Sequence, residues 1–392
     1  MRRSSLVLAF VVLTAAVRPL DAQGAPAARP LSTRSAVYFW TREEKLRGFP
    51  AFDSIFASHR VPRGARAYAL PSGRALPLPH DTVDAFMRAN EVAGLLVLVD
   101  GRVRLERYAL GHAATRRWTS FSVAKSLTSM LAGAAVRDGA IRSLDDDVAA
   151  YLPTLKGSVY DGVTVRQLIT MTTGVAWNEA YADPASDIVQ LYNGVGASIP
   201  SPLGVAKGLR REVPAGTKWR YKTVETHLLA NLVVAATKKP LAQYASEKLW
   251  APYGMEADAS WVVDDMGVEQ GGCCFQATLR DYGRIGQFVM QGALVQSVSI
   301  VPRGWMRAAT TKQADIGTPG HGYGYQWWTN DDGSFDAQGI FGQSIHIDPA
   351  RRLVVVMHSA WPTALGEALE ARAGRFVAAV QGAVDAEGVR RR

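Results

Sequence analysis

Two side chains in the first third of the chain have the types and the spacing needed for acyl transfer. Ser122-Val123-Ala124-Lys125 has the form S-x-x-K and stands at the start of a predicted helix. A spacing of three places the serine hydroxyl and the lysine amine on one helix face, one turn apart. A neutral amine in that position can accept the hydroxyl proton, and burial in an apolar helix lowers a lysine pKa toward the neutral form. The pattern predicts Ser122 as a nucleophile and Lys125 as its general base.

The S-x-x-K motif is weak alone, and a helix-capping serine followed by a surface lysine is the alternative interpretation. It is unique in this chain, because only Lys125 among the ten lysines has a serine three positions earlier. Polar residues nearly vanish after Thr128-Ser129, which predicts a buried helix, and a lysine is rarely buried without a purpose. Free N–H groups at the start of this helix would also stabilise an oxyanion beside Ser122.

Other catalytic patterns are missing from the sequence. It contains no G-x-S-x-G elbow, no P-loop and no G-x-G-x-x-G, and its seven histidines show no HExxH or other close metal-ligand spacing. A Ser/His/Asp triad stays open, because the members of a triad are distant along a chain. We expect neither a metal nor an organic cofactor.

A third group is needed to protonate the leaving amine or alcohol, and Tyr221 is the candidate. It lies in the stretch from Trp219 to Thr223, directly before a predicted helix that begins near Val224. The alternative interpretation is an aromatic residue that packs against the start of that helix.

The order of three motifs resembles one known group of enzymes. Ser122 to Lys125, then Tyr221-Lys222-Thr223, then Ala337-Gln338-Gly339 on a C-terminal strand resemble the serine β-lactamase and penicillin-recognising superfamily. Within it, the sequence looks most like class C-like esterases and 6-aminohexanoate-dimer (nylon-oligomer) hydrolases. The likeness runs from about residue 36 to the end, and its supporting stretches are Met171-Thr172-Thr173-Gly174-Val175, residues 177–184, Gly272-Cys273-Cys274, residues 322–328 and Gly342-Gln343.

This resemblance implies an acyl-enzyme mechanism. Ser122 would attack a carbonyl, Lys125 would take its proton, and Tyr221 would relay a proton to the leaving group. The backbone N–H groups of Ser122 and Ile340 would form the oxyanion hole. The substrate-binding residues that the resemblance and the aromatic content imply are Tyr181, Thr223, Trp327 and Gly339. For Tyr181 a loop aromatic packed on the surface is the alternative, and for Trp327 a core tryptophan.

Two departures from the superfamily pattern bear on the substrate. The third motif has a lysine or histidine at its first position in β-lactamases, whereas this chain has Ala337, and Thr223 replaces the usual asparagine of the second motif. Without that cation the site has less to hold a substrate carboxylate, so a small ester or an amide fits better. A β-lactamase or D-alanyl-D-alanine carboxypeptidase is the enzyme alternative. A non-catalytic ligand-binding sensor is the alternative of another class.

The elements that must position these residues come from both ends of the chain. An apolar run, Asp100-Gly101 and an alternating run predict a β-hairpin over residues 95–106, and the C-terminal part predicts strands over 323–329, 335–347 and 353–359. Helical patterns follow at 123–139, 165–171, 224–237, 241–250 and 279–290, and again at 365–384. We therefore expect an α/β protein with a β-lactamase-like fold. Its antiparallel sheet combines N- and C-terminal strands, flanked by helices, with a mainly helical region inserted at about 122–300.

The N-terminus has the pattern of an export signal. Arg2 and Arg3 precede an apolar run from Leu6 to Val17, which is too short to span a bilayer comfortably. We expect a signal peptide over residues 1–22, a flexible leader over 23–35 and one hydrolase domain over 36–392. The protein is then exported to the periplasm or the medium, without stable insertion in the membrane.

The composition narrows the classes of binding partner that we expect. The net charge is +9, but the basic residues are scattered rather than arranged in a stripe, so no nucleic-acid partner is expected. The expected ligand is a small-molecule ester or amide, and the oligomeric state stays open. The only cysteines, Cys273 and Cys274, are neighbours, and both a vicinal disulfide and two buried thiols remain open.

Overall fold

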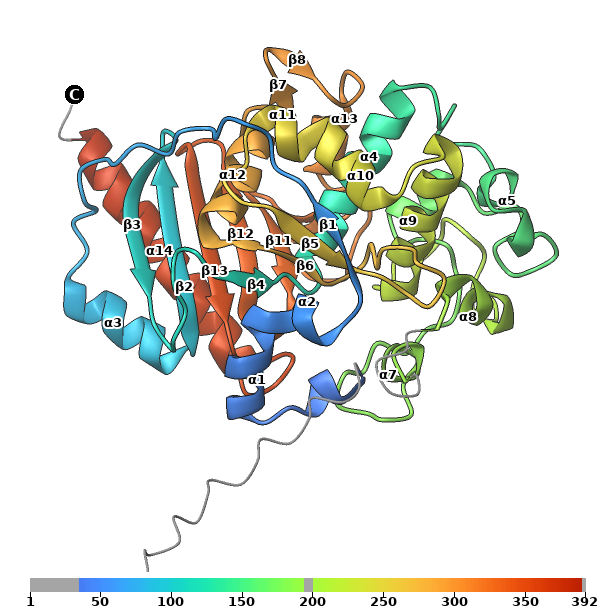
Figure 1. Ribbon diagram of the computed structural model, residues 1–392, viewed down its shortest axis with the longest axis horizontal. Helices are drawn as coiled ribbons and strands as arrows, with labels where there is room; N and C mark the ends of the chain where they lie inside the picture. The colour runs from blue at the N-terminus through green and yellow to red at the C-terminus, as the bar shows by residue number, and fades with distance from the viewer. Residues whose placement is uncertain (1–34, 194–199, 390–392) are drawn as a thin grey trace, which may run out of the picture. The chain divides into compact units, whose positions relative to one another are not determined.

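The computed structural model describes residues 35–193 and 200–389 and is built around a seven-stranded antiparallel sheet (Figure 1). The strand order is β3-β2-β13-β12-β11-β10-β9. Strand β2, from the N-terminal half, pairs with β13 near the C-terminus, so the two ends of the chain share one sheet as predicted. The strands are β2 (Val92–Val99), β3 (Arg102–Tyr108), β9 (His321–Tyr323), β10 (Trp328–Asn330), β11 (Phe335–Gly339), β12 (Gln343–Asp348) and β13 (Leu353–Ser359).

The hairpin of β2 and β3 forms where the sequence predicts it. Asp100 and Gly101 adopt φ values of 53° and 70°, which is the left-handed backbone of a tight hairpin turn. Val99 pairs with Arg102 across that turn. The prediction for this element is confirmed.

Helices cover both faces of the large sheet. On one face, α3 (His80–Ala89) and α14 (Glu367–Val389) pack against β2 and β13, and the rings of Phe86 and Phe376 stack with centroids 4.0 Å apart. On the other face lie α12 (Leu279–Met290) and α4 (Val123–Arg137). Helix α12 can approach β13 closely because Gly286 has no side chain; a Cβ there would lie 2.5 Å from a Val354 methyl group.

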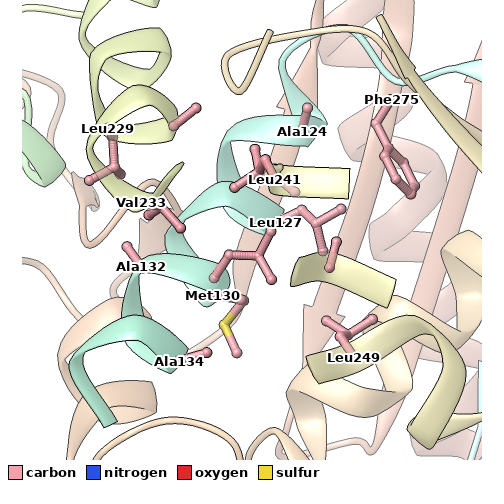
Figure 2. Packing of buried hydrophobic residues seen from close by; sticks show 14 of the residues in the cluster. Ala124, Leu127, Met130, Ala132, Ala134, Leu229, Val233, Leu241, Leu249 and Phe275 are labelled. Carbon is pink, nitrogen blue, oxygen red and sulfur yellow. The ribbon is translucent and has the colours of Figure 1, made fainter. Parts of the chain in front are cut away.

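Helix α4 runs through the centre of the core and carries the S-x-x-K motif at its start. All residues from Val123 to Ala135 are buried. They pack against α9 (Thr223–Thr237), whose Leu229 and Val233 belong to the same buried cluster as Leu127 and Met130 (Figure 2). A helix that is apolar on every side is stable only when it is surrounded, and this burial holds the motif in a fixed place.

A four-stranded sheet was not predicted. Its order is β1-β5-β6-β4, and it consists of β1 (Ser58–Val61), β4 (Arg117–Thr119), β5 (Ala259–Val262) and β6 (Phe275–Thr278). Two of these strands lie in the region predicted as mainly helical. They are three or four residues long, too short to show a period. A two-stranded ribbon of β7 (Leu294–Val295) and β8 (Val298–Ser299) also forms.

The remaining elements are short, and one of them has a capping box. Thr164 caps α6 with a capping box to Gln167. None of the helices in residues 35–193 and 200–389 is long and apolar enough to cross a membrane. The short elements are η1 (Ser35–Phe39), α1 (Arg42–Gly48), η2 (Phe49–Ala51), α2 (Phe52–Ile55), α5 (Val148–Tyr151), η3 (Pro153–Leu155), α6 (Val165–Ile169), α7 (Asp187–Leu191), α8 (Pro202–Gly208), α10 (Leu241–Ala245), the π-helix η4 (Ser246–Trp250), α11 (Ala251–Tyr253), α13 (Trp305–Ala309) and η5 (Ile340–Gly342).

Two strand predictions were too long. The strand predicted over 323–329 is split between β9 and β10, where Gln326 has a φ of 63°. The strand predicted over 335–347 is broken at η5, where Phe341 and Gly342 have φ values of 61° and 84°. Left-handed residues cannot continue a strand, and a bulky residue in that region gives no signal in the sequence. The predicted signal peptide and leader up to residue 34 lie outside the described residues.

Candidate active site

Ser122 and Lys125 lie together at the start of α4. Ser122 occupies the N-cap position but its side chain makes no capping hydrogen bond. Lys125 is only 1% exposed, and its Nζ lies 2.9 Å from the Ser122 Oγ. The interpretation as a capping serine with a surface lysine is wrong on both counts.

The Lys125 amine has two further partners, both buried. Its Nζ lies 3.0 Å from the Thr223 Oγ1 at the start of α9 and 2.7 Å from the Gly272 carbonyl oxygen. Burial lowers the pKa of Lys125 from 10.5 to about 7, and the nearby Glu179 carboxylate acts against that shift. The amine can therefore be neutral near neutral pH, as a general base requires.

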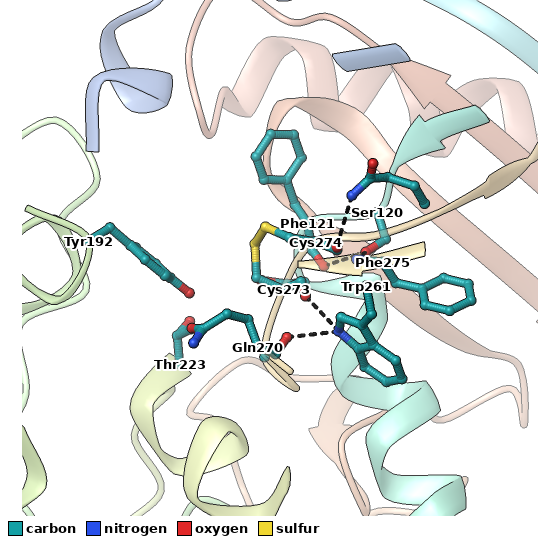
Figure 3. The surroundings of a disulfide bond; sticks show 12 residues. Ser120, Phe121, Tyr192, Thr223, Trp261, Gln270, Cys273, Cys274 and Phe275 are labelled. Carbon is teal, nitrogen blue, oxygen red and sulfur yellow. Dashed lines mark hydrogen bonds between the residues drawn. A yellow bond between two sulfur atoms is a disulfide. The ribbon is translucent and has the colours of Figure 1, made fainter. Parts of the chain in front are cut away.

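A turn at residues 270–274 supplies the Gly272 carbonyl. Cys273 and Cys274 form a vicinal disulfide there, which decides between the two possibilities that the sequence left open (Figure 3). The Trp261 indole N–H donates to the carbonyls of Gln270 and Cys273, each at 3.0 Å. A Cβ at Gly272 would lie 2.9 Å from the Thr223 carbonyl oxygen, so only glycine allows this turn to approach α9 and reach Lys125.

Tyr221 faces the same two residues from the segment before α9. The Lys125 Nζ lies 4.9 Å from the centre of its ring, and its phenol is in hydrogen-bonding contact with the Ser122 side chain. Burial, followed by the charge of Glu179, raises the pKa of Tyr221, so the phenol keeps its proton and can donate it. The ring stacks on Trp328 at 5.4 Å.

The end of β11 lies directly against the nucleophile. A Cβ added to Gly339 would lie 3.0 Å from the Ser122 backbone nitrogen and 2.5 Å from the Ser120 carbonyl oxygen. Ile340 follows immediately, in the break between β11 and β12. The backbone amides predicted to form an oxyanion hole, those of Ser122 and Ile340, therefore come from two segments in close contact.

Two phenylalanines with left-handed backbones flank these amides. Phe121 precedes Ser122 with a φ of 42°, and Phe341 follows Ile340 with a φ of 61°. Their rings are 5.2 Å apart, and both contact Phe49, at 5.0 and 5.5 Å. A bulky residue in this region is strained, so ring packing in a buried cluster must hold it.

The structure also reveals a residue that the sequence analysis missed. Glu179 lies between α6 and α7 and accepts hydrogen bonds from the Trp177 indole, the Tyr181 hydroxyl at 2.8 Å, and both the hydroxyl and the backbone N–H of Thr223. Its only signal was its position two residues before Tyr181. Tyr181 is half-buried and also packs against Tyr38, with ring centres 5.7 Å apart.

Two residues that were predicted to bind substrate, Trp327 and Thr223, do not face an open site. Trp327 is completely buried in the core, and the half-buried Trp328 next to it faces Tyr221 instead. The prediction of Trp327 as a pocket wall is therefore wrong, because its side chain points between α4 and the sheet. Thr223 is 3% exposed and lies behind Lys125. Ala337 is 1% exposed and offers no cation at its position.

Comparison with known proteins agrees with this geometry. The family model "Beta-lactamase" matches residues 80–379. The 6-aminohexanoate-dimer hydrolase of Paenarthrobacter ureafaciens is 30% identical over 284 residues, which cover 68% of this chain and 72% of that protein.

Solved structures share the fold. A Bacillus anthracis protein assigned as a 6-aminohexanoate-dimer hydrolase superposes with a TM-score of 0.76, at 23% identity, over 86% of this chain and 94% of its own. EstCE1, a hydrolase with promiscuous acyltransferase activity, gives a TM-score of 0.61 at 15% identity, over 78% of this chain and 98% of its own. The chain therefore belongs to the beta-lactamase family and is a serine hydrolase of the esterase and amidase type.

Proposed function

We propose that this protein hydrolyses a small ester or amide through an acyl-enzyme on Ser122. The observation that carries the proposal is the 2.9 Å contact between the Ser122 Oγ and the amine of a lysine that is 1% exposed. Burial brings the pKa of that amine to about 7, so a large fraction is neutral at physiological pH.

The reaction follows from the positions of three groups. The Ser122 oxygen attacks the carbonyl carbon while its proton passes to the Lys125 Nζ. The oxyanion that forms is stabilised by the backbone N–H groups of Ser122 and Ile340. Tyr221 gives its proton to the leaving alcohol or amine and regains one from Lys125. Water then attacks the acyl-enzyme by the reverse sequence of proton transfers.

The substrate that fits this site carries no carboxylate next to the scissile bond. Ala337 supplies no cation there, and Glu179 adds a negative charge. The half-buried rings of Tyr221 and Trp328 offer an apolar wall for the acyl or leaving group. The relative from Paenarthrobacter ureafaciens makes linear amides of aminohexanoate the first amides to test.

The test is release of p-nitrophenol from a short-chain p-nitrophenyl ester by the purified protein, followed by hydrolysis of 6-aminohexanoate dimer. Ser122→Ala should lose steady turnover of both and remain folded, because removing the nucleophile costs several orders of magnitude in rate. Lys125→Ala should lose nearly as much, and Tyr221→Phe should slow acylation. Equal rates in Ser122→Ala and the unmodified protein would refute the assignment.

The same experiment separates two other functions. A single stoichiometric burst without turnover would favour a ligand sensor. Rapid turnover of benzylpenicillin, with a much slower ester reaction, would favour a β-lactamase.

We also propose that the protein is exported and that it acts without nucleic-acid or membrane partners. The basis is the N-terminal signal pattern, and a disulfide between Cys273 and Cys274 suits an oxidising compartment. N-terminal sequencing of the protein recovered from the periplasm or medium would show whether residues 1–22 are removed.

A further inference from the structure

Glu179 is a carboxylate at the edge of the catalytic group with no part in the mechanism so far. Four donors point at its two oxygens: the Trp177 indole, the Tyr181 hydroxyl, and the hydroxyl and backbone N–H of Thr223. A carboxylate that is ionised only accepts hydrogen bonds, and four donors match its acceptor capacity. These four hydrogen bonds therefore hold the Glu179 carboxylate in one orientation.

The contact with Glu179 determines the direction of the Thr223 hydroxyl. A serine or threonine hydroxyl has one proton, and an ionised carboxylate cannot donate, so the Thr223 proton is committed to Glu179. The Thr223 oxygen can then only accept from the Lys125 Nζ, 3.0 Å away. The Gly272 carbonyl, 2.7 Å from the same nitrogen, also can only accept.

These two acceptors use every hydrogen of the neutral amine. A neutral lysine carries two N–H donors and one lone pair, and Thr223 and Gly272 take both donors. Among the described residues, the third neighbour of the Lys125 Nζ at hydrogen-bond distance is the Ser122 Oγ, at 2.9 Å. The lone pair therefore points at the Ser122 hydroxyl, which is the direction needed to remove its proton.

We propose that Glu179 is a positioning residue that acts through the Thr223 hydroxyl to aim the lone pair of neutral Lys125 at Ser122. This inference rests on the proposed roles of Ser122 and Lys125. When the Ser122 proton moves to the Lys125 nitrogen, the ammonium has three N–H groups for Ser122, Thr223 and Gly272, so the same arrangement serves both protonation states.

The charge of Glu179 has a second, separable effect. Titratable groups face it from four elements: Tyr181 on its own loop, Lys125 on α4, Tyr221 before α9 and Tyr323 on β9. Its negative charge raises the pKa of Lys125 and so opposes the effect of burial. Replacing it with a neutral group should move the acidic limb of the pH profile to lower pH, which a purely structural residue would not do.

The experiment is a double-mutant cycle with Glu179→Gln and Thr223→Val, measured as kcat/KM for a p-nitrophenyl ester on the high-pH plateau. Thr223→Val keeps the shape but removes the hydroxyl, and we expect a loss of about tenfold or more, as for a hydrogen bond to a charged group. Thr223→Ser should recover most of that loss. Glu179→Gln should lower the plateau and shift the acidic limb to lower pH, and the exposed Glu43→Gln is the matched control for loss of one charge.

The double variant decides the mechanism. Because Glu179 acts through Thr223, adding Glu179→Gln to Thr223→Val should cost little more on the plateau. Fully additive losses, or a Thr223→Val variant with the unmodified kcat/KM, would overturn the proposal. The urea unfolding midpoint of each variant shows that the losses do not come from unfolding. Failure of the proposed function is distinguishable, because Ser122→Ala would then retain turnover.

Discussion

The pH dependence of acylation tests the central feature of the site, which is a lysine made neutral by burial. With a pKa of about 7, half of the Lys125 amines are neutral at pH 7, whereas at the ordinary value of 10.5 only about 0.03% would be. Below pH 7 the neutral fraction falls tenfold per pH unit, so at pH 5 about 1% remains. We expect kcat/KM to rise with pH, to reach half its plateau near pH 7, and to be about 100-fold below the plateau at pH 5.

The assay is hydrolysis of a p-nitrophenyl ester at constant ionic strength, read at the isosbestic wavelength of the product, with the protein confirmed folded at each pH. The parameter kcat/KM is used because it reports ionisation of the free enzyme. Lys125→Arg is the control, since a guanidinium stays protonated throughout and cannot act as a base. A profile that is flat down to pH 5, or one that rises only near pH 10, would refute the reasoning.

Three further predictions follow from the packing. Gly339→Ala should lower kcat by about 100-fold or more with little change in fold, because its Cβ would lie 3.0 Å from the Ser122 nitrogen and displace a segment proposed to form the oxyanion hole. Steady-state kinetics measures this effect, and a loss well below about 100-fold would contradict the prediction. Lys222→Ala should lower the free energy of unfolding by about 3 kcal/mol, because it leaves the fully buried Glu225 without its ion-pair partner at 3.4 Å; urea titration measures this, and a loss below about 1 kcal/mol would contradict it. Burial lowers the pKa of His112 from 6.5 to about 4, so as the pH falls the unfolded chain binds a proton before the folded protein does. The free energy of unfolding should therefore fall by up to about 3 kcal/mol between pH 6.5 and pH 4. In urea titrations over this range, His112→Asn should remove this part of the pH dependence of stability.

The sequence was sufficient for the parts of the site that depend on spacing along one element. Ser122 and Lys125 are one helical turn apart, so their proximity follows from the helix alone, and Tyr221 precedes a helix that the apolar pattern places correctly. The sheet was predictable for a similar reason, since Asp100-Gly101 fixes the turn of its first hairpin.

The parts that depend on contacts across the fold could not be predicted. Glu179 acts on Thr223 from a loop with no periodic pattern, and nothing local indicates that the two meet. Trp327 and Trp328 are adjacent and chemically identical, so only the break in the strand at Gln326 decides which ring is buried. The left-handed Phe341 was missed because its conformation is imposed by neighbours rather than by its own preference.

The phenylalanine cluster around the segments proposed to form the oxyanion hole includes residues that precede the stretch matched by the family model. The family model matches from residue 80, yet Phe49 contacts the rings of Phe121 and Phe341, and Phe52 contacts the ring of Phe121. Lys45 adds to the same support, since its Nζ lies 4.5 Å from the Phe341 ring centre and donates to the Trp361 carbonyl at 3.0 Å. A version that begins at residue 80 would keep Ser122, Lys125 and Tyr221. It would lose the side chains of residues 45–52 that pack against Phe121 and Phe341. Substitutions at Lys45, Phe49 or Phe52 therefore offer a route to change the rate without touching a reacting group.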